Sequence, residues 1–377
     1  MQLRYTYRIY PTAGQRIALA QTFGCVRAVW NDCLRARKDA HEQGLPFPKS
    51  GDLSKLMITQ ARQTEARAWL SNAPVGVLQQ SLRDLDAAYR NFFDSLSGKR
   101  KGAKLGEPQF KSRRDNRQTA RYTKSDRWKI VDTGRLRLPK VGEITVKWSR
   151  ALPSAPTTVT IVKDPSGRYF ASFIVETDPA AETMPPTAGD QGIDLGLTHF
   201  AIMADGSRVK NPRFLRRAEK KLKREQRRLS RKAKGSTNQD KQRIIVARAH
   251  AAVADARKDF HHQLSTRLIR ENQTVTVETL SVKALARTRQ AKSVHDAGWS
   301  AFVNMLEYKA ARYGRTLTKV DRTFPSSQLC SACGHRDGPK TLNIRAWTCS
   351  ECGTWHDRDH NSAKNVKHEG SRIRAAV

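Results

Sequence analysis

Residues 191–202 read QGIDLGLTHFAI, an apolar run that carries a single carboxylate, Asp194. Aliphatic residues lie directly before and after this aspartate, and Gly192 and Gly196 flank them. An ionised carboxylate within an apolar strand is costly unless something compensates its charge. A bound cation is the usual compensation, and Mg²⁺ takes oxygen ligands from one or two carboxylates together with phosphate. The stretch therefore predicts a buried strand that holds a candidate metal ligand.

The chain has a large excess of positive charge. Its 377 residues include 70 Lys and Arg but 35 Asp and Glu, which gives a formal net charge of +35. A folded protein this basic repels itself and needs a polyanion to neutralise it. Nucleic acid is the favoured partner because phosphate contacts release counterions, and an anionic membrane surface is the alternative. No apolar run reaches the ~18–20 residues of a spanning helix and no signal peptide opens the sequence, so we expect a cytoplasmic, nucleoid-associated protein without a membrane partner.

The periodicity of the first half predicts a β-domain interrupted by helices. Alternation typical of strands covers 3–9 and returns over 119–177, with a hairpin across 164–167. Apolar residues at helical spacing predict helices over 14–42, 53–70 and 76–96. We therefore expect a barrel-like β-domain formed by residues 1–12 and 115–180, with an inserted helical domain at 13–114 that ends in a basic linker.

The second half, residues 188–377, alternates between strands and helices, which is typical of an α/β fold. A turn at 204–206 closes the first two strands. The remaining expected elements are helices over 208–234, 239–270 and 300–313, strands over 272–280 and 315–320, and a helix after Asp359.

Four cysteines near the C-terminus form two CxxC pairs. Fifteen residues separate Cys330 and Cys333 from Cys349 and Cys352, and a glycine follows each pair. This spacing is typical of tetrahedral Zn²⁺, and four thiolates leave no open coordination position, so the predicted role is structural. Redox chemistry is the weaker alternative, and the nearby His356 is not expected to displace a cysteine.

Two further carboxylates complete a candidate catalytic site with Asp194. Glu278 ends a short β-branched strand, and either Asp357 or Asp359 precedes the last helix. These acids are far apart in the sequence, so only the fold can unite them. Hydrolysis of a phosphodiester by two metals needs such a cluster to hold the ions ~3.5–4 Å apart. We predict these acids as ligands of Mg²⁺ or Mn²⁺.

Two segments are unusually basic. Residues 98–114 are glycine-containing and lack periodicity, while 208–234 hold 14 Lys or Arg and 2 acids at helical propensity. Such runs are often solvated surface, but a nearly all-positive run repels itself unless phosphates lie against it. The predicted nucleic-acid-binding residues are Lys99, Arg100, Lys101, Lys104, Lys111, Arg113 and Arg114 in the first segment, and Arg216, Arg217, Lys220, Lys221, Arg224, Arg227 and Arg228 in the second.

Several motifs together resemble the TnpB (OrfB) family, insertion-sequence proteins related to the RNA-guided type V CRISPR effectors. The resemblance runs from Tyr7 to about Val366, which is nearly the whole chain. The motifs are YPTAGQ near the N-terminus, EPQFKSR at 107–113, GIDLGL around Asp194, VETL around Glu278, SSQLCSACG, and CSECGTWHDRDHNSAKN.

The resemblance implies a RuvC-like nuclease domain of the RNase H fold over 188–377, with a zinc ribbon inserted at 326–356. The third acid would be Asp359, which would also cap a helix starting near Asn361, and Asp357 is its rival. The first half would be a β-barrel wedge domain with an inserted helical recognition domain. Thr279 and Ser362 depart from the family pattern, and neither is expected to touch the ligands.

The resemblance also implies an RNA-guided, metal-dependent DNA endonuclease of a transposable element. A noncoding guide RNA from the transposon end, bound by one protein per RNA, would direct it to double-stranded DNA beside a short target-adjacent motif, while base pairing reads the rest. The alternatives are a guided repressor that binds without cutting, a DNA transposase, and a ribosome-associated structural protein. The presence of all three acids favours the nuclease.

Overall fold

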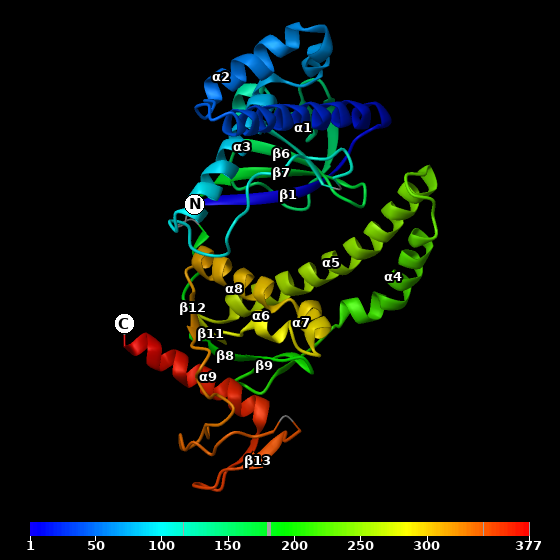
Figure 1. Cartoon of the computed structure of the whole chain (residues 1–377). Helices are drawn as coiled ribbons and strands as arrows, with labels where there is room; N and C mark the ends of the chain where they lie inside the picture. The colour runs from blue at the N-terminus through cyan, green and yellow to red at the C-terminus, as the bar shows by residue number, and fades with distance from the viewer. Residues whose placement is uncertain (116, 179–181, 342, 377) are drawn as a thin grey trace. The chain divides into compact units, whose positions relative to one another are not determined.

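The computed structural model describes residues 1–115, 117–178, 182–341 and 343–376. The chain divides into two compact units, Met1–Thr177 and Asp178–Val377 (Figure 1). Among the described residues, no helix is both long enough and apolar enough to cross a membrane.

The first unit contains a seven-stranded antiparallel sheet. Strand β1 (Gln2–Tyr10) lies inside the sheet, where it pairs with both β5 and β7, so the chain enters the sheet before the helices and completes it afterwards. The alternating side chains Tyr5, Tyr7 and Ile9 are buried on one face. The sheet order is β2 (Gln118–Thr123), β6 (Thr158–Lys163), β7 (Tyr169–Glu176), β1, β5 (Gly142–Lys147), β4 (Leu136–Leu138) and β3 (Lys129–Ile130).

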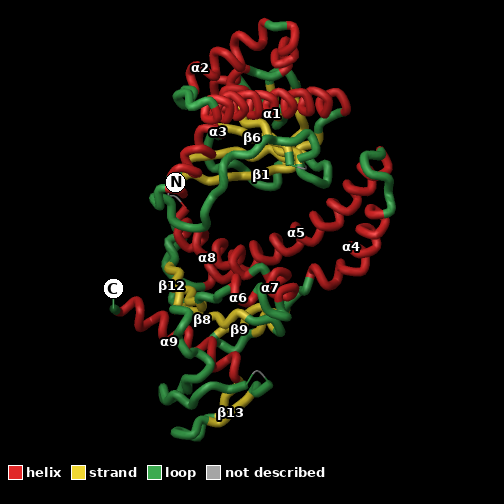
Figure 2. Tube along the Cα trace, in the orientation of Figure 1, coloured by secondary structure: helices red, strands yellow, loops and turns green. Residues whose placement is uncertain are grey.

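The α-helices of the first unit, α1, α2 and α3, are labelled in Figure 2 and lie between β1 and β2 in the chain. The long α1 (Ala13–Glu42) begins at a capping box of Thr12 and Gln15, and α3 (Val75–Leu96) packs on it through a shared apolar core. Residues 53–70, predicted as one α-helix, instead form α2 (Ser50–Ser54), a π-helix and two 3₁₀ segments up to Asn72.

The second unit contains a five-stranded mixed sheet in the order β10-β9-β8-β11-β12. The first three strands are antiparallel neighbours, whereas β11 and β12 run parallel to β8. The parallel pairs require long crossovers. Helices α4 (Phe214–Ser230) and α5 supply the first, and α6 (Val282–Leu285), α7 (Ala291–Ala297) and α8 supply the second. The strands are β8 (Asp190–Leu195), β9 (His199–Met203), β10 (Arg208–Lys210), β11 (Thr274–Glu278) and β12 (Thr316–Val320).

Helices cover both faces of this sheet. On one face, α5 (Thr237–Glu271) and α8 (Trp299–Tyr313) pack their apolar side chains against Ile193, Val275 and Val277. On the other face, α9 (Arg358–Ala375) lies directly on β8 and β11. The sheet is therefore a buried layer between helices, and the alternation along each strand decides which residues face α9.

Glycines allow α9 to approach the sheet closely. A Cβ added at Gly192 would lie 2.4 Å from the carbonyl oxygen of Ala363 and 2.6 Å from the backbone nitrogen of Lys367. A Cβ at Gly370 would meet the side chain of Thr276 in the same way. The motif glycine before Asp194 thus sets the distance between β8 and the helix that carries Asp359.

Replacement of Gly192 by alanine is expected to destabilise the second unit, because the clashing atoms belong to the α9 backbone and cannot rotate away. Overpacking of this kind costs about 1–3 kcal/mol, measured by urea or thermal unfolding. Gly14→Ala is the matched control, since a Cβ there meets nothing within 4 Å. Equal stability of the two variants would contradict this account of the glycine.

Two expected helix starts are wrong. Residues 208–210 form the edge strand β10, and helix α4 (Phe214–Ser230) begins only after Arg213. The last helix begins at Arg358 rather than near Asn361, and Asp357 is its N-cap. The other helices and strands that were expected in the second unit lie within three residues of their expected positions, as does the turn after β9. Helices α6 and α7 and the hairpin before α9 were not predicted.

Between β12 and α9 lie two short connected loops and a hairpin of β13 (Ala346–Thr348) and β14 (Trp355–Asp357). A single bridge between Leu329 and Arg336 closes the first loop. Cys330 and Cys333 lie in this first loop, and Cys349 and Cys352 lie in the turn between β13 and β14. This arrangement brings the four sulfurs together.

Candidate metal and nucleic-acid sites

Asp194 and Glu278 come from neighbouring parallel strands. In the register of β8 and β11, Gly192 lies opposite Thr276 and Ile193 opposite Val277, so the next pair is Asp194 with Glu278. Because Ile193 and Val277 point into the apolar core, the acids point to the α9 face. Both carboxylates are half-buried at the carboxyl end of the strands.

Asp359 completes this cluster from the first turn of α9. Its side chain lines, together with Asp194, a cavity of about 290 Å³. Burial, with the negative charges of Glu278 and Asp359 nearby, raises the pKa of Asp194 well above its usual range. Burial also raises the pKa of Glu278. The three predicted acids therefore lie close enough to interact electrostatically.

Two serines that sequence reasoning missed hold Glu278. The Ser326 hydroxyl donates a hydrogen bond to Glu278 Oε1, and the Ser362 hydroxyl lies 3.4 Å from the same oxygen and 2.9 Å from Ser326 Oγ. The expectation that Ser362 is remote from the acids is wrong. A signal was present, because Ser362 follows Asp359 by three residues and so shares its helix face.

Asp357 has a different role from Asp359. Its Oδ1 accepts a hydrogen bond from the His360 backbone N–H at 2.9 Å, and its Oδ2 pairs with Arg208 at 2.9 Å. Asp357, and not Asp359, thus caps α9, which corrects the sequence-based expectation. Asp359 makes a looser ion pair with Arg345 at 3.6 Å and keeps its carboxylate toward the cavity.

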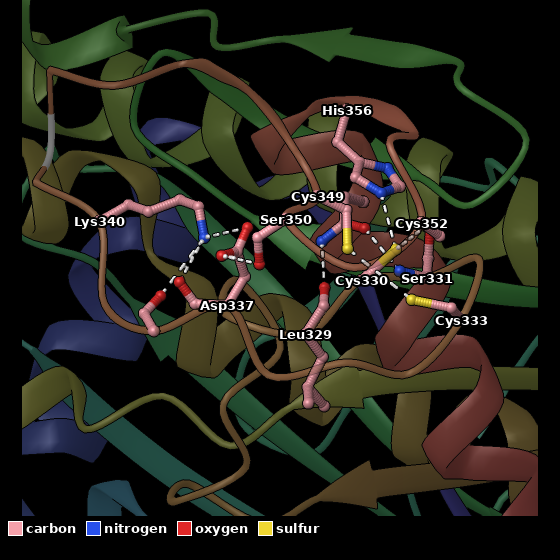
Figure 3. A network of polar contacts seen from close by, with 12 residues as sticks. Leu329, Cys330, Ser331, Cys333, Asp337, Lys340, Cys349, Ser350, Cys352 and His356 are labelled. Carbon is pink, nitrogen blue, oxygen red and sulfur yellow. Dashed lines mark hydrogen bonds and ion pairs between the residues drawn. The ribbon is translucent and has the colours of Figure 1, made fainter.

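The four cysteines form a compact sulfur cluster (Figure 3). Cys330 Sγ and Cys352 Sγ are 3.6 Å apart, Cys333 Sγ and Cys349 Sγ are 3.7 Å apart, and all four sulfurs lie within 4.8 Å of one another. A tetrahedral ion with ~2.3 Å Zn–S bonds requires sulfur separations of roughly 3.8 Å. The donor set and its spacing therefore suit a metal ion.

The surroundings of the sulfur cluster support the same role. His356 Nε2 lies 3.0 Å from Cys330 Sγ, and the His356 ring packs on Trp347 at 4.7 Å between centroids. The histidine therefore contacts a sulfur from outside and does not replace a cysteine. In the described part of the chain, these cysteines are the one group of three or more candidate ligands whose donor atoms all lie within 4.8 Å.

The second predicted basic segment lies mostly on one helix. All seven of its predicted residues are on α4, where Arg224 and Arg228 pair with Glu225, and α4 packs on α5 through Leu222, Ala249 and Val253. The first segment is a loop held against α1, where Asn31 bonds the Lys111 backbone in both directions. The Lys111 ammonium stacks on the Trp30 ring at 3.5 Å, and burial lowers its pKa to about 8.

Three family models match the chain. The model OrfB_IS605, described as "Probable transposase", matches residues 172–289, and a model of the Cas12f1-like TNB domain matches 299–366. A model described as a helix-turn-helix domain of OrfB_IS605 matches residues 1–45. Here those residues form strand β1 and the single continuous helix α1, followed by a short turn.

Individual relatives extend these matches over nearly the whole chain. A Streptomyces pristinaespiralis protein named "Putative RNA-guided DNA endonuclease" is 43% identical over 96% of this chain and 88% of its own length. The Escherichia coli K12 protein named "Putative RNA-guided DNA endonuclease InsQ" is 28% identical over 98% and 93%. Among solved structures, a Cas12f1–sgRNA–target DNA complex aligns with a TM-score of 0.54 at 12% identity, covering 97% of this chain and 98% of that one, which is a likeness of fold. The chain belongs to the TnpB (OrfB) family of insertion-sequence proteins.

Proposed function

We propose that this protein is an RNA-guided DNA endonuclease of a transposable element. The observation that carries the proposal is the meeting of Asp194, Glu278 and Asp359 at the carboxyl ends of β8 and β11. The names of relatives that match over most of their length support the same activity. By family resemblance, one protein would bind a noncoding guide RNA from the transposon end and cut double-stranded DNA beside a short target-adjacent motif. In a prokaryotic cell, that target is DNA of the nucleoid.

The three acids would hold Mg²⁺ or Mn²⁺. Two-metal hydrolysis of a phosphodiester needs such a cluster of acids to hold the ions ~3.5–4 Å apart. The raised pKa of Asp194 supports this assignment, because a cation would take the place of the proton that its surroundings favour. When bound, such ions activate water and stabilise the departing oxygen of the cleaved phosphodiester.

The protein's own contribution is to fix these ligands before DNA arrives. Ser326 and Ser362 orient the Glu278 carboxylate, while the close contact of Gly192 with α9 holds Asp194 and Asp359 together. Arg345 neutralises Asp359 while no cation is bound, and it lies in the same cavity. Rigid placement of this kind avoids reorganisation during the reaction.

The domain assignments extend the proposal to the rest of the chain. We assign the second unit to the RuvC-like nuclease of the RNase H fold, with Zn²⁺ in the four-cysteine ribbon. The first unit would be the barrel-like wedge domain with the helical recognition insertion. The basic loop of the first unit and helix α4 of the second unit would contact the guide–target heteroduplex, with Lys111 contributing mainly through its packing on Trp30.

The test is to express the protein with its native flanking DNA, purify it at moderate salt and sequence the RNA that accompanies it. One discrete RNA from beside the gene is expected, and that RNA supplies the target for a cleavage assay with Mg²⁺. Guided binding without any nick would favour the repressor. Strand-joined products from element-end DNA would favour a transposase.

The roles of the two neighbouring aspartates are separable by substitution. Asp359→Ala is expected to reduce guided cleavage by about 10³-fold or more, the value of several kcal/mol of lost metal stabilisation, with little change in stability. Asp357→Ala is expected to lower stability by about 1 kcal/mol through loss of the helix cap while retaining cleavage. Loss of cleavage in the Asp357 variant alone, at a temperature where it is folded, would reverse the assignment.

A further inference from the structure

A second cavity, of about 260 Å³, adjoins the carboxylate cavity. The two share Leu197, Thr198 and Gln290 as lining residues, so the turn between β8 and β9 forms the wall between them. Three arginines line the second cavity: Arg213, Arg216 and Arg289. Within the residues that the structure describes, none of these guanidinium groups has a carboxylate partner, in contrast to the paired arginines elsewhere on α4.

The single acid of this cavity is already engaged. Both oxygens of Asp296 accept the Leu215 backbone N–H, at 2.9 and 3.1 Å, and Oδ1 also lies 3.3 Å from Arg257. Asp296 therefore caps the start of α4, which has no side-chain cap of its own. The carboxylate of Asp296 thus stabilises the start of α4 and pairs with Arg257. Among the described residues, the three arginines of the cavity remain without a carboxylate partner.

One of these arginines, Arg213, has a strained backbone and is tied to the turn beside the carboxylate site. Arg213 has left-handed backbone angles, φ 50° and ψ 49°, a strained conformation that non-glycine residues rarely adopt. Asn211 Oδ1 accepts the Arg213 N–H at 3.2 Å, and Asn211 Nδ2 donates to the Leu197 carbonyl at 2.9 Å. Asn211 thus ties the strained arginine to the wall between the cavities.

We infer that this arginine cavity, defined by Arg213, Arg216 and Arg289, binds a backbone phosphate of the DNA strand that is being cut, beside the scissile position. Guanidinium groups are suited to phosphate because their donors form a rigid fork. Leu197 is three residues from Asp194, so the chain between them spans at most about 10 Å, which keeps a phosphate bound in the arginine cavity within a few nucleotides of the cut.

This inference rests on the proposed nuclease function and deepens it. A phosphate held in the arginine cavity would position the strand across the carboxylates without taking part in bond cleavage. Arg213 and Arg289 are therefore positioning residues. Their loss should weaken the capture of the strand and leave the chemical step intact.

The test combines arginine substitution with phosphate neutralisation. Arg213→Gln and Arg289→Gln, in the RNA-loaded protein, are expected to raise KM for target DNA about tenfold with kcat within about twofold. Glutamine keeps the same backbone strain at position 213. In wild type, one methylphosphonate within a few nucleotides of the cut should cause a similar loss, and that loss should disappear in the variants.

The control is Arg267→Gln, an exposed arginine of α5 outside both cavities. Equal effects of Arg267→Gln and Arg213→Gln, or methylphosphonate losses that are the same with and without the arginines, would overturn the inference. If the wild-type protein binds nucleic acid but does not cut, the same comparison is made on equilibrium binding of the single strand. Failure of the proposed activity is thereby distinguished from failure of the arginine cavity.

Discussion

Asp194→Ala abolishes guided DNA cleavage, with an expected loss of at least about 10³-fold, while guide RNA and target DNA remain bound. The reason is that Asp194 lies close enough to both Glu278 and Asp359 to feel their charges, so its removal takes away one of the three proposed metal ligands. Loss of several kcal/mol of charge stabilisation corresponds to this factor at 1.36 kcal/mol per tenfold. Single-turnover cleavage and filter binding measure the two properties separately.

Asp205→Ala is the matched control for removal of an acid from the same unit. Its Oδ1 accepts the Ser207 N–H at 2.8 Å and its Oδ2 bonds Gln191 at 3.1 Å, so it shapes the turn after β9. We expect cleavage to persist in this variant. Retained cleavage in Asp194→Ala, or equal loss in both variants, would remove Asp194 from the catalytic site.

Asp194 also has a measurable effect on the stability of the protein. Because its pKa is raised in the folded chain, the folded state holds the proton more tightly than the unfolded state. The contribution of Asp194 to stability is therefore fully present below the unfolded pKa of ~3.9 and is lost as pH rises through the folded value. At neutral pH in EDTA, Asp194→Asn should raise the melting temperature. Added Mg²⁺ should stabilise wild type and leave Asp194→Asn unchanged.

The sequence predicted the acids and the cysteines because their chemistry restricts them. A carboxylate in an apolar strand needs a compensating charge, and two CxxC pairs at this spacing are typical of a metal site. Both features can be read from the sequence without knowledge of the fold. The side chains that orient them were not predictable in the same way. Ser326 reaches Glu278 across 48 positions, and serine alone carries no signal of such a contact.

Other failures have physical causes of the same kind. Residues 208–210 are rich in basic side chains that favour a helix, yet pairing with β9 makes them an edge strand, since tertiary context overrides propensity. In HDRDH, two aspartates lie two positions apart and either could cap the helix. Only the backbone geometry assigned the cap to Asp357 and left Asp359 facing the cavity.

Loss of the sulfur cluster is expected to abolish cleavage because the cysteine loop is attached to the helix that carries Asp359. Asn361 bonds Ser331 N–H and the Leu329 carbonyl, and Asn365 bonds the carbonyls of Ser326 and Leu329. The cysteine loop is thereby attached to α9 at the turn that carries Asp359. The Ser326 hydroxyl in turn donates a hydrogen bond to Glu278. Unfolding of this loop would release both acids.

Cys349→Ser should therefore lower both zinc content and activity. We expect about one Zn²⁺ per chain in wild type by metal analysis and substoichiometric zinc in the variant, because structural zinc contributes roughly 10–16 kcal/mol of binding free energy to its folded site. Cys33→Ala, which changes a buried thiol in the helical core of the first unit, should leave the zinc content unchanged. Full cleavage by a zinc-free Cys349→Ser protein would show that the acids keep their positions without the ribbon, and the coupling through Asn361 and Ser326 would then be wrong.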